Sequence, residues 1–246
     1  FRLFSISHSL KIIYLVHGFR FTSQTKFLRA FFFKSIEKIL SFKTKIFITI
    51  NNEDFNYAKN HLFKKAPTYK INGVGLDLKQ NYKIKIKKKE NIKKILIIGA
   101  YKKSKGYLEV LKIAKILQKR GFKIDCYGYG DYKKFQYIKI KERINNISFN
   151  KFDFNLKKKI RNYDILLHLS IREGLPVSVM ECLVEGLPVI CKNIRGNKDL
   201  IKDGYNGFFV NSYNEVPNKI FYLNLDKNYF NKMRYNAIRS ITQDFS

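Results

Sequence analysis

Two glutamates lie eight residues apart in a stretch of small and apolar residues. Glu173 directly precedes a Gly-Leu-Pro tripeptide at 174–176, and Glu181 lies in the apolar run that follows. The apolar run at 165–169 predicts a buried strand, and the proline suits the first turn of a helix over 177–185. Because ligands of parallel sheets bind beyond the carboxyl ends of the strands, we expect Glu173 on a loop that faces a ligand crevice.

The expected strand, bend and helix predict an anion site between the two carboxylates. The first turn of the helix presents N–H groups and the positive pole of the helix dipole, which suit a phosphate or a diphosphate. A carboxylate on each side of such a site matches a sugar nucleotide, which carries hydroxyl groups on its sugar and on its ribose. The alternative is that Glu173 caps the helix and Glu181 is an ordinary helix residue, which is the commoner meaning of this spacing alone.

Strand-like runs alternate with helix-length amphipathic segments, as is typical of βαβ units with parallel sheets. Strands are expected at residues 11–16, 45–50, 95–99, 122–128, 147–149, 165–169, 187–191 and 206–210. Helices are expected at residues 25–40, 53–63, 106–120, 131–143, 156–162, 177–185 and 229–240. The sequence therefore predicts an α/β fold.

A lysine-dense stretch without an apolar face divides this alternation into two blocks. Residues 80–93 are predicted to be a linker, with a solvated edge strand as the alternative. Residues 1–79 then form one doubly wound, Rossmann-like domain, and residues 94–246 form a second. The first block holds too few strands for a complete domain of this kind, so we expect its beginning to be missing.

Basic residues outnumber acidic ones by 49 to 19, which gives the 246-residue chain a net charge of +30. This charge favours a polyanionic partner, whether nucleic acid, an anionic membrane surface or a phosphorylated substrate. The alternative is a coding bias toward lysine, isoleucine and asparagine. A hydrophobic content of 45% excludes a chain that is disordered throughout. Cys126, Cys182 and Cys191 show no paired spacing, and we expect buried, reduced thiols.

Residues 168–210, HLSIREGLPVSVMECLVEGLPVICKNIRGNKDLIKDGYNGFFV, resemble the donor-binding segment of family 4 glycosyltransferases, which have the GT-B fold. The shared pattern is Ser, Glu-Gly-x-Pro, a second Glu eight residues after the first, Gly-x-Pro-Val-Ile, a glycine-containing loop and Asp-Gly-x-Asn-Gly. HGFRF at 17–21 and ITINNEDFNYAK at 48–59 resemble the end of the N-terminal domain in a bacterial polysaccharide branch of this family, and INGVGLDL at 71–78 resembles the junction between its domains. The resemblance implies two Rossmann-like domains of the GT-B type, of which the N-terminal one is incomplete.

The resemblance also implies roles for individual residues. Glu173 would contact the donor sugar, Glu181 the ribose hydroxyls, and His17 the sugar and the acceptor. The further residues implied are Gly174, Leu175, Pro176 and Val177, whose backbone faces the diphosphate; Lys105, in the place of the family's phosphate-binding lysine; and Arg195 and Gly196, on a sugar-contacting loop. The YGYGD stretch at 127–131 follows an expected strand and is placed to approach the nucleotide, although a simple turn explains it as well.

One position departs from the family pattern. The family has an arginine five residues before its phosphate-binding lysine, whereas this chain has Ala100, which leaves Lys102 or Lys103 to substitute. Taken alone, Lys105 is explained as one of many solvated lysines, and His17 as a loop histidine.

The implied activity is transfer of a sugar, with retention of anomeric configuration, from a nucleotide-sugar to a saccharide or polyprenyl-diphosphate-linked acceptor in surface polysaccharide synthesis. UDP is the expected nucleotide. The chain contains no Asp-x-Asp triplet and no His or Cys ligand spacing, so we expect neither a metal nor another cofactor. The expected location is cytoplasmic and peripheral on the inner face of the cell membrane, where positive charge favours anionic lipids.

Two other functions stay open from the sequence. A donor-binding remnant without catalysis is one, because the opening strands of the N-terminal domain are not found and the C-terminal helix is short. A basic nucleic-acid-binding protein is the other, because tyrosines and phenylalanines are interleaved with lysines. The lysines are scattered and no known DNA- or RNA-binding motif occurs, so we expect no specific nucleic-acid partner.

Overall fold

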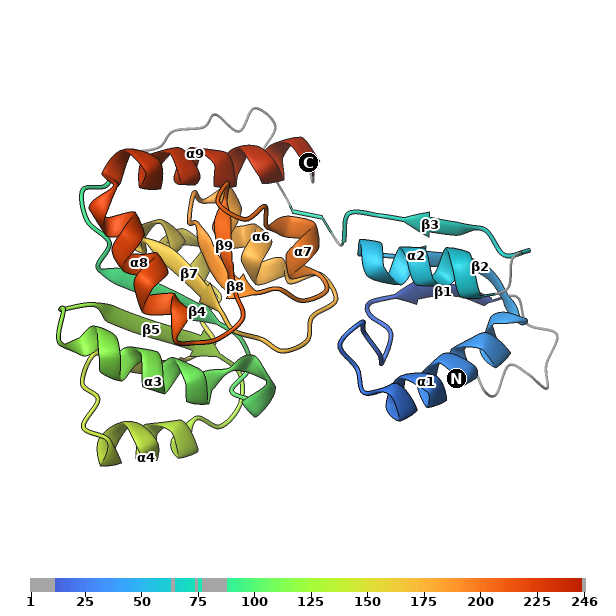
Figure 1. The fold of residues 1–246 in the computed structure, drawn as a ribbon, viewed down its shortest axis with the longest axis horizontal. Coiled ribbons are helices and arrows are strands. Elements are labelled where there is room, and N and C mark those ends of the chain that lie inside the picture. Colours follow the sequence, from blue (N-terminus) through green and yellow to red (C-terminus); the bar gives the residue numbers. More distant parts are fainter. Residues whose placement is uncertain (1–11, 63–64, 74, 77–87, 245–246) are drawn as a thin grey trace. The chain divides into compact units, whose positions relative to one another are not determined.

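The computed structural model describes residues 12–62, 65–73, 75–76 and 88–244 (Figure 1). The chain divides into two compact units. Residues 1–75 with 173–175 form the N-terminal unit, and residues 76–172 with 176–246 form the C-terminal unit. Each unit has a parallel sheet with helical crossovers, which confirms the predicted α/β fold class. Residues 80–87 of the expected linker lie outside the described residues.

The N-terminal unit contains a three-stranded parallel sheet in the order β1-β2-β3. Its elements are β1 (Ile12–Val16), α1 (Phe27–Ser41), β2 (Thr44–Thr49), α2 (Asn52–His61) and β3 (Thr68–Lys70). Phe19 and Phe47 lie at the centre of its core. Helix α2 begins at a side-chain cap, because Asp54 N–H donates a hydrogen bond of 2.8 Å to the Asn51 side chain.

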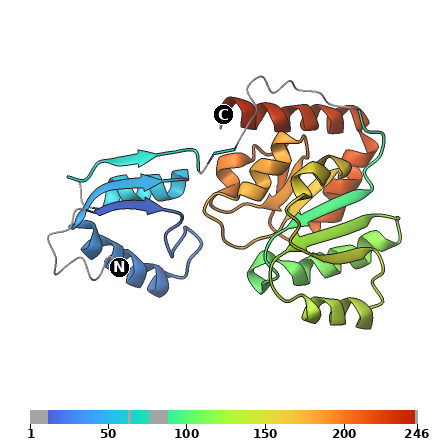
Figure 2. The ribbon, with the colours of Figure 1, turned by 180° about the vertical axis from the view of Figure 1, so that it is seen from behind.

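The C-terminal unit contains a six-stranded parallel sheet in the order β6-β5-β4-β7-β8-β9. Its strands are β4 (Lys94–Ile98), β5 (Lys123–Gly128), β6 (Ile147–Lys151), β7 (Ile165–His168), β8 (Val189–Lys192) and β9 (Gly207–Val210). Its helices are η2 (Lys103–Lys105), α3 (Tyr107–Gln118), α4 (Lys133–Lys141), α5 (Leu156–Lys159), η3 (Ile160–Asn162), α6 (Val177–Val184), α7 (Asn197–Leu200), α8 (Glu215–Leu225) and α9 (Lys227–Asp244). Figure 1 shows α3 and α8 on one face of the sheet, and Figure 2 shows α5 and α6 on the other. Among the described residues, no helix has the length and apolar character needed to cross a membrane.

Helix α8 is the one long element of the C-terminal unit that the sequence reading missed. Pro217 argues against a helix in its interior, but here it lies in the first turn, where the N–H groups have no intrahelical acceptor and a proline costs little. The signal was the apolar spacing of Val216, Ile220 and Leu223, all of which are fully buried. The burial of the apolar stripe, rather than the presence of the proline, determines that this segment forms a helix.

The three cysteines are free and buried, in agreement with the expected burial. Burial raises the pKa of the Cys126 and Cys182 thiols well above their usual value, so both stay protonated and behave as small apolar side chains.

A buried carboxylate holds the start of the C-terminal sheet. Asp164 Oδ2 accepts hydrogen bonds of 2.8 Å from the N–H groups of both Lys93 and Lys94. Its other oxygen, Oδ1, pairs with Lys89 Nζ at 2.6 Å. Burial is the largest influence on Lys89 and lowers the pKa of its ammonium, against the opposing effect of Asp164. Asp164 thereby anchors the chain where it enters β4, next to the beginning of β7.

Replacing Asp164 by alanine is predicted to lower the free energy of unfolding by about 2–4 kcal/mol, because two partly buried N–H groups and a partly buried ammonium lose their acceptor. Urea unfolding followed by circular dichroism measures this change. The matched control is Glu90→Ala, which removes an exposed carboxylate paired with Lys227 at 3.2 Å. That change is expected to cost at most about 1 kcal/mol. Equal losses in the two variants would show that Asp164 is only one more surface charge.

Candidate functional site

The C-terminal sheet reverses its direction of growth between β4 and β7. From β4 the chain adds β5 and β6 on one side, and from β7 it adds β8 and β9 on the other. All pairings are parallel, so the carboxyl ends of the strands lie along one edge. Open sheets of this kind bind ligands beyond that edge at the point of reversal. The loops that follow β4 and β7 therefore form the candidate site.

The loop after β4 depends on a glycine at the start of α3. Gly106 has a φ of +80°, in the left-handed region that favours glycine. A Cβ placed on Gly106 would lie 2.7 Å from both the Cβ and the carbonyl oxygen of Leu169, the residue after β7. The missing side chain thus allows the beginning of α3 to pack directly on the β7 loop.

A backbone hydrogen bond joins the two loops. Ile171 N–H, in the β7 loop, donates to the carbonyl oxygen of Ser104 over 3.0 Å. Ser104 lies in η2, whose last residue is Lys105. The Lys105 side chain is half-buried, and its stem runs past Gly99, where an added Cβ would lie 3.6 Å from Lys105 Cδ. Lys105 is therefore placed by both loops, which distinguishes it from a lysine on an open surface.

Helix α6 begins at the same edge of the sheet. Pro176 is its N-cap residue, and the Pro176 carbonyl oxygen accepts hydrogen bonds from the N–H groups of Val179 (3.1 Å) and Met180 (3.3 Å). The N–H groups of Val177 and Ser178 lie in the first turn, before the first of these bonds, and have no acceptor within the helix. Within the described part of the chain, no side chain caps this helix start. The positive pole of the helix and its first N–H groups favour an anionic ligand.

Glu181 lies one turn further along α6, on the same helix face as Val177. Its carboxylate forms an ion pair of 2.9 Å with Lys157 Nζ, and 21% of the Glu181 side chain is exposed. Lys157 comes from α5, on the crossover between β6 and β7. The carboxylate is thus held beside a cation and still has accessible surface for a ligand's hydroxyl groups.

Arg195 and Gly196 lie on the loop that follows β8, at the same edge of the sheet. Gly196 has a φ of +81° and precedes the single turn α7. Arg195 is buried, with 3% of its surface exposed.

The predicted residues His17 and Glu173–Leu175 belong to the N-terminal unit. His17 follows β1 directly and is exposed on the N-terminal unit. The segment Glu173–Leu175 follows β7 in sequence and is grouped with the N-terminal unit. Within the C-terminal unit, the structure brings together Lys105, the start of α6 and Glu181.

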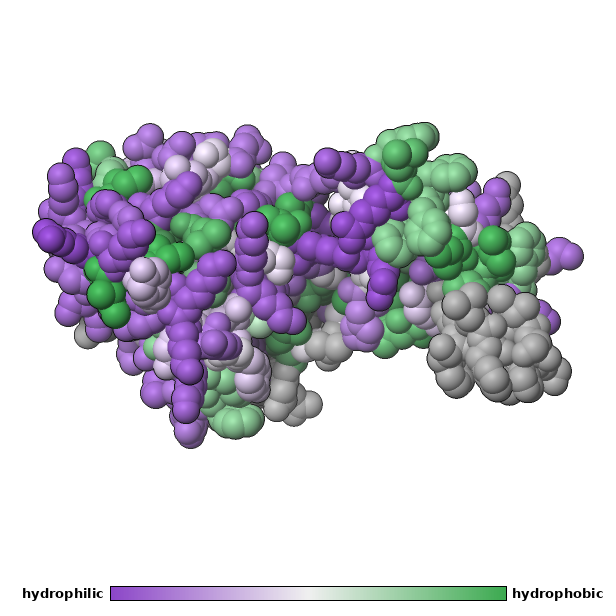
Figure 3. All heavy atoms as spheres, turned by 90° about the horizontal axis from the view of Figure 1, so that it is seen from below, coloured by the Kyte–Doolittle hydropathy of each residue, from purple (hydrophilic) through white to green (hydrophobic). Residues whose placement is uncertain are grey.

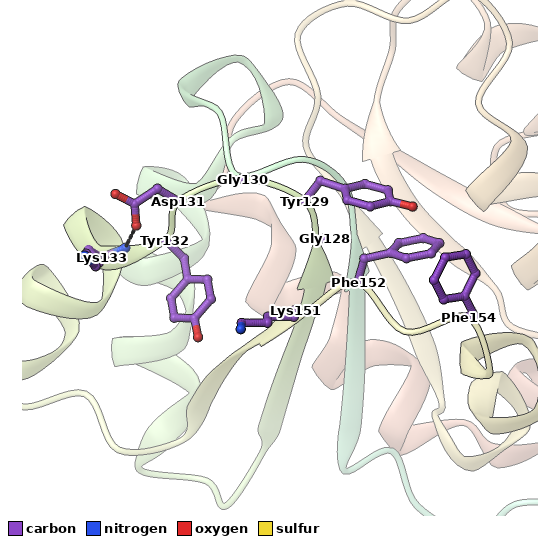
Figure 4. Close-up of a pocket in the computed structure, with 9 residues that line it drawn as sticks. All are labelled: Gly128, Tyr129, Gly130, Asp131, Tyr132, Lys133, Lys151, Phe152 and Phe154. Atoms are coloured by element: carbon purple, nitrogen blue, oxygen red, sulfur yellow. Dashed lines mark hydrogen bonds between the residues drawn. The ribbon is translucent and has the colours of Figure 1, made fainter.

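An aromatic hollow of about 570 Å³ lies at the carboxyl ends of β5 and β6 (Figure 4). It is lined by Gly128, Tyr129, Gly130, Asp131, Tyr132, Lys133, Lys151, Phe152 and Phe154. The rings of Tyr129 and Phe152 stack with centroids 4.1 Å apart, and Phe154 meets Phe152 edge-on at 4.9 Å. Exposed aromatic rings of this kind offer stacking surfaces to a planar ligand.

The hollow adjoins the β4 loop. A Cβ on Gly128 would lie 1.9 Å from the carbonyl oxygen of Gly99, so the two glycines let the β4 and β5 loops touch. Tyr101 N–H also donates to the Tyr129 carbonyl oxygen over 2.8 Å. The aromatic hollow and Lys105 therefore lie along one continuous edge of the sheet.

The sequence reading missed Phe152, Phe154 and Lys157. The available signal was their position in a segment that directly follows the strand expected at 147–149, because residues after parallel strands lie at the ligand edge. The YGYGD stretch at 127–131 does line the hollow. It also contains a turn, in which Asp131 Oδ1 accepts a hydrogen bond of 2.9 Å from Lys133 N–H.

This arrangement can hold an anion by Lys105 and the start of α6, hydroxyl groups by Glu181, and a flat ring by the aromatic hollow. In the described residues, no group of three or more His, Cys, Asp and Glu side chains is placed to hold a metal ion. The strand order is that of a Rossmann-like domain, and the fold is of the GT-B type.

The chain belongs to the family described as glycosyl transferases group 1, whose family model matches residues 79–240. It is similar to the putative glycosyltransferase EpsD of Bacillus subtilis, with 26% identity over 218 residues that cover 82% of this chain and 57% of that protein. It is also similar to the UDP-Gal:alpha-D-GlcNAc-diphosphoundecaprenol alpha-1,3-galactosyltransferase of Escherichia coli, with 25% identity over 261 aligned residues that cover 96% of this chain and 65% of that protein. The chain thus spans 57–65% of the length of these two relatives.

Among solved structures, the chain resembles Anabaena Alr3699/HepE, crystallised in complex with UDP-glucose. The TM-score is 0.79 at 16% sequence identity, over 100% of this chain and 71% of that one. At this identity the likeness establishes the fold.

Replacing Gly106 by alanine is predicted to cost about 3 kcal/mol or more of unfolding free energy, because left-handed strain adds to a clash with Leu169. The same substitution at Gly121, where φ is +72° and the nearest atom lies 4.0 Å away, carries the strain without the clash. We expect about 1–2 kcal/mol for Gly121→Ala. Thermal unfolding of the two variants measures the difference, and identical losses would mean that the packing of the two loops contributes nothing.

Proposed function

We propose that this chain binds a nucleotide-sugar, most simply a UDP-sugar, and acts in its transfer to a saccharide or polyprenyl-diphosphate-linked acceptor with retention of anomeric configuration. The observation that carries the proposal is the junction of the β4 and β7 loops, where Lys105, the start of α6 and Glu181 share one edge of the sheet. The family assignment and the relatives' names support the same reaction class.

The diphosphate would lie against the start of α6. Departure of a nucleoside diphosphate develops negative charge on the bridging oxygen. A lysine ammonium and N–H groups that are already oriented stabilise such charge without reorganising during the reaction. Lys105 and the N–H groups of Val177 and Ser178 are the donors that we assign to this task. No metal is required by this assignment.

The ribose would lie beside Glu181. A carboxylate accepts hydrogen bonds from two neighbouring hydroxyl groups at once, and these charge-assisted bonds are stronger than neutral ones. Lys157 holds the Glu181 carboxylate at 2.9 Å and so keeps its orientation defined before a ligand arrives.

The nucleobase would enter the aromatic hollow. The hollow lies next to the β4 loop, at the same edge of the sheet. Tyr129 is 59% exposed and Phe154 is 87% exposed, so both offer ring faces for stacking. The choice of uracil rests on UDP in the names of the Escherichia coli relative and of the Anabaena structure.

The acceptor side is assigned to the N-terminal unit and to the β7 loop. Glu173 is proposed to hold the donor sugar, and His17 to approach the sugar and the acceptor. Gly174 and Leu175 supply the backbone next to the diphosphate, and Arg195 and Gly196 form a loop near the sugar. A lipid-linked saccharide is proposed as acceptor because the Escherichia coli relative is named for a diphosphoundecaprenol substrate.

Two glutamate variants separate the proposed subsites. Glu181→Ala is predicted to weaken binding of UDP itself by about tenfold or more, because the ribose loses a charged acceptor. Glu173→Ala is predicted to leave UDP binding unchanged and to weaken only the sugar-bearing form. Titration calorimetry with UDP and a panel of UDP-sugars measures both effects.

The matched control is Glu185→Ala, at the other end of α6, where the carboxylate pairs with Arg161. Its UDP affinity is expected to stay within about twofold of the unmodified chain. Equal weakening by Glu181→Ala and Glu185→Ala, or no UDP binding by the unmodified chain, would contradict the assignment. If the chain binds the donor but transfers its sugar to no lipid-linked acceptor, the proposed transfer is wrong and only the proposed donor binding is retained.

A further inference from the structure

The two walls of the aromatic hollow come from different segments of the chain. Tyr129 lies in the loop after β5, whereas Phe152 and Phe154 lie in the segment after β6. Figure 4 shows the three rings gathered together, with the Tyr129 ring against the Phe152 ring. On the side of the C-terminal unit seen in Figure 3, hydrophobic residues reach the surface in small groups among hydrophilic ones. A stacking surface built from two segments depends on the contacts that hold those segments at a fixed separation.

Tyr101, in the loop after β4, is hydrogen-bonded to both segments. Its N–H group donates to the Tyr129 carbonyl oxygen over 2.8 Å. Its hydroxyl oxygen accepts a hydrogen bond of 3.0 Å from the N–H group of Asn150, in β6. The same hydroxyl lies 2.5 Å from the Asn150 carbonyl oxygen and 2.9 Å from the Cys126 carbonyl oxygen, so it donates to one of these two. One side chain thus joins the β4 loop to the ends of both β5 and β6.

The ring of Tyr101 is packed among other aromatic rings. Tyr101 is 6% exposed, and its ring centroid lies 5.0 Å from that of Tyr107, 5.1 Å from that of Tyr132 and 6.0 Å from that of Phe149. A phenylalanine ring would fill the same space, and a buried hydroxyl costs free energy unless it is hydrogen-bonded. Burial raises the pKa of the Tyr101 hydroxyl above its usual value, so the group stays protonated and able to donate. The hydroxyl is therefore explained by the two strands that it joins rather than by packing.

The loop that begins with Tyr101 also carries the proposed phosphate-binding lysine. Lys105 N–H donates to the carbonyl oxygen of Lys102, the residue after Tyr101, over 3.0 Å. The segment is thus a short turn, with Tyr101 bonded beside the aromatic hollow at one end and Gly106 packed on Leu169 at the other. Tyr101 lies between the two parts of the proposed site that would hold the base and the diphosphate.

We propose that the Tyr101 hydroxyl is a positioning group for the nucleobase of the donor. By joining the ends of β5 and β6, it holds the two walls of the aromatic hollow in the arrangement that stacks a planar base before the ligand arrives. A surface that is already ordered binds with a smaller loss of conformational freedom than one that must be ordered by its ligand. This inference rests on the proposed function, because it requires that the base of a nucleoside diphosphate enters the hollow. Tyr101 acts through the loops and does not itself touch the base.

Tyr101→Phe removes the hydroxyl and leaves the ring. The affinity for UDP is expected to fall about tenfold, because Asn150 N–H loses its acceptor and the wall after β6 loses its fixed position. The affinity for pyrophosphate, which has no base, is expected to stay within about twofold. Titration calorimetry measures both ligands at a temperature at which circular dichroism shows every variant to be folded, so a lower overall stability does not enter the comparison.

The matched control is Tyr163→Phe, which removes the same group at the same degree of burial. Tyr163 is also 6% exposed, and its hydroxyl donates to Asp125 Oδ2 over 3.0 Å. This change leaves the bonds of Tyr101 in place. The affinity of Tyr163→Phe for UDP is expected to stay within about twofold of that of the unmodified chain.

A double-mutant cycle separates positioning of the hollow from a general structural role. Phe152→Ala removes the ring that stacks on Tyr129. In that background, Tyr101→Phe is expected to lower the affinity for UDP by less than about threefold, because the wall that Tyr101 positions no longer carries its stacking ring. A residue that only stabilises the fold would have the same effect in both backgrounds.

Hydrogen exchange followed by mass spectrometry gives a readout that needs no variant. In the unmodified chain, UDP is expected to slow amide exchange in residues 127–132 and 149–154 together, and pyrophosphate is expected to leave both segments unchanged. Slower exchange in only one of the two segments, or equal slowing by pyrophosphate, would contradict a base held between two walls.

Three binding results would overturn the inference and leave the donor site in place. These are equal weakening of UDP binding by Tyr101→Phe and Tyr163→Phe, equal weakening of UDP and pyrophosphate binding by Tyr101→Phe, and an undiminished effect of Tyr101→Phe beside Phe152→Ala. Absence of UDP binding by the unmodified chain would overturn the donor site itself, and this inference with it.

Discussion

The candidate site rests on the contact between the loops that follow β4 and β7. Gly106 has no side chain, so α3 starts against Leu169, and the hydrogen bond from Ile171 to Ser104 ties the two loops together over 3.0 Å. Strand order alone brings the two loops to the same edge, but this contact fixes their spacing. Lys105, the last residue of η2, directly follows Ser104 and precedes Gly106, so this contact positions its backbone at the same edge of the sheet.

Electrostatics at this edge follow from the backbone as much as from side chains. The high positive charge of the chain is spread over both units, and lysines alone do not mark a site. What distinguishes the edge is a helix start without a side-chain cap, a half-buried lysine and a carboxylate held by Lys157. These groups are preorganised, so binding of a diphosphate and a ribose would need little rearrangement. The aromatic hollow adds an apolar surface at the end of the same row of loops.

Much of this could be read from the sequence because local chemistry decides it. The Gly-Leu-Pro bend and the helix that starts after Pro176 are local features, and the structure contains this helix as expected. Apolar runs separated by amphipathic segments were enough for every strand of the two sheets except β3 (Thr68–Lys70), with ends that shift by one or two residues. Helix α8 was not predicted, although Val216, Ile220 and Leu223 have helical spacing and are buried.

Contacts between distant segments could not be read in the same way. The pairing of Ser104 with Ile171 joins residues that are 67 positions apart, and Lys157 reaches Glu181 from a different crossover. Phe152 and Phe154 gain meaning only when β6 is known to end beside β5. Resemblance to a family supplied roles for single residues, and the structure supplied the neighbours through which Lys105 and Glu181 would exert them.

A crystal structure of the chain with UDP tests the central claim most directly. The predicted result places the diphosphate within hydrogen-bond reach of Lys105 Nζ and of the N–H groups that begin α6, with the ribose hydroxyls on Glu181 and the uracil in the aromatic hollow. UDP bound at any other part of the C-terminal unit, or bound at this edge with its ribose turned away from Glu181, would contradict it.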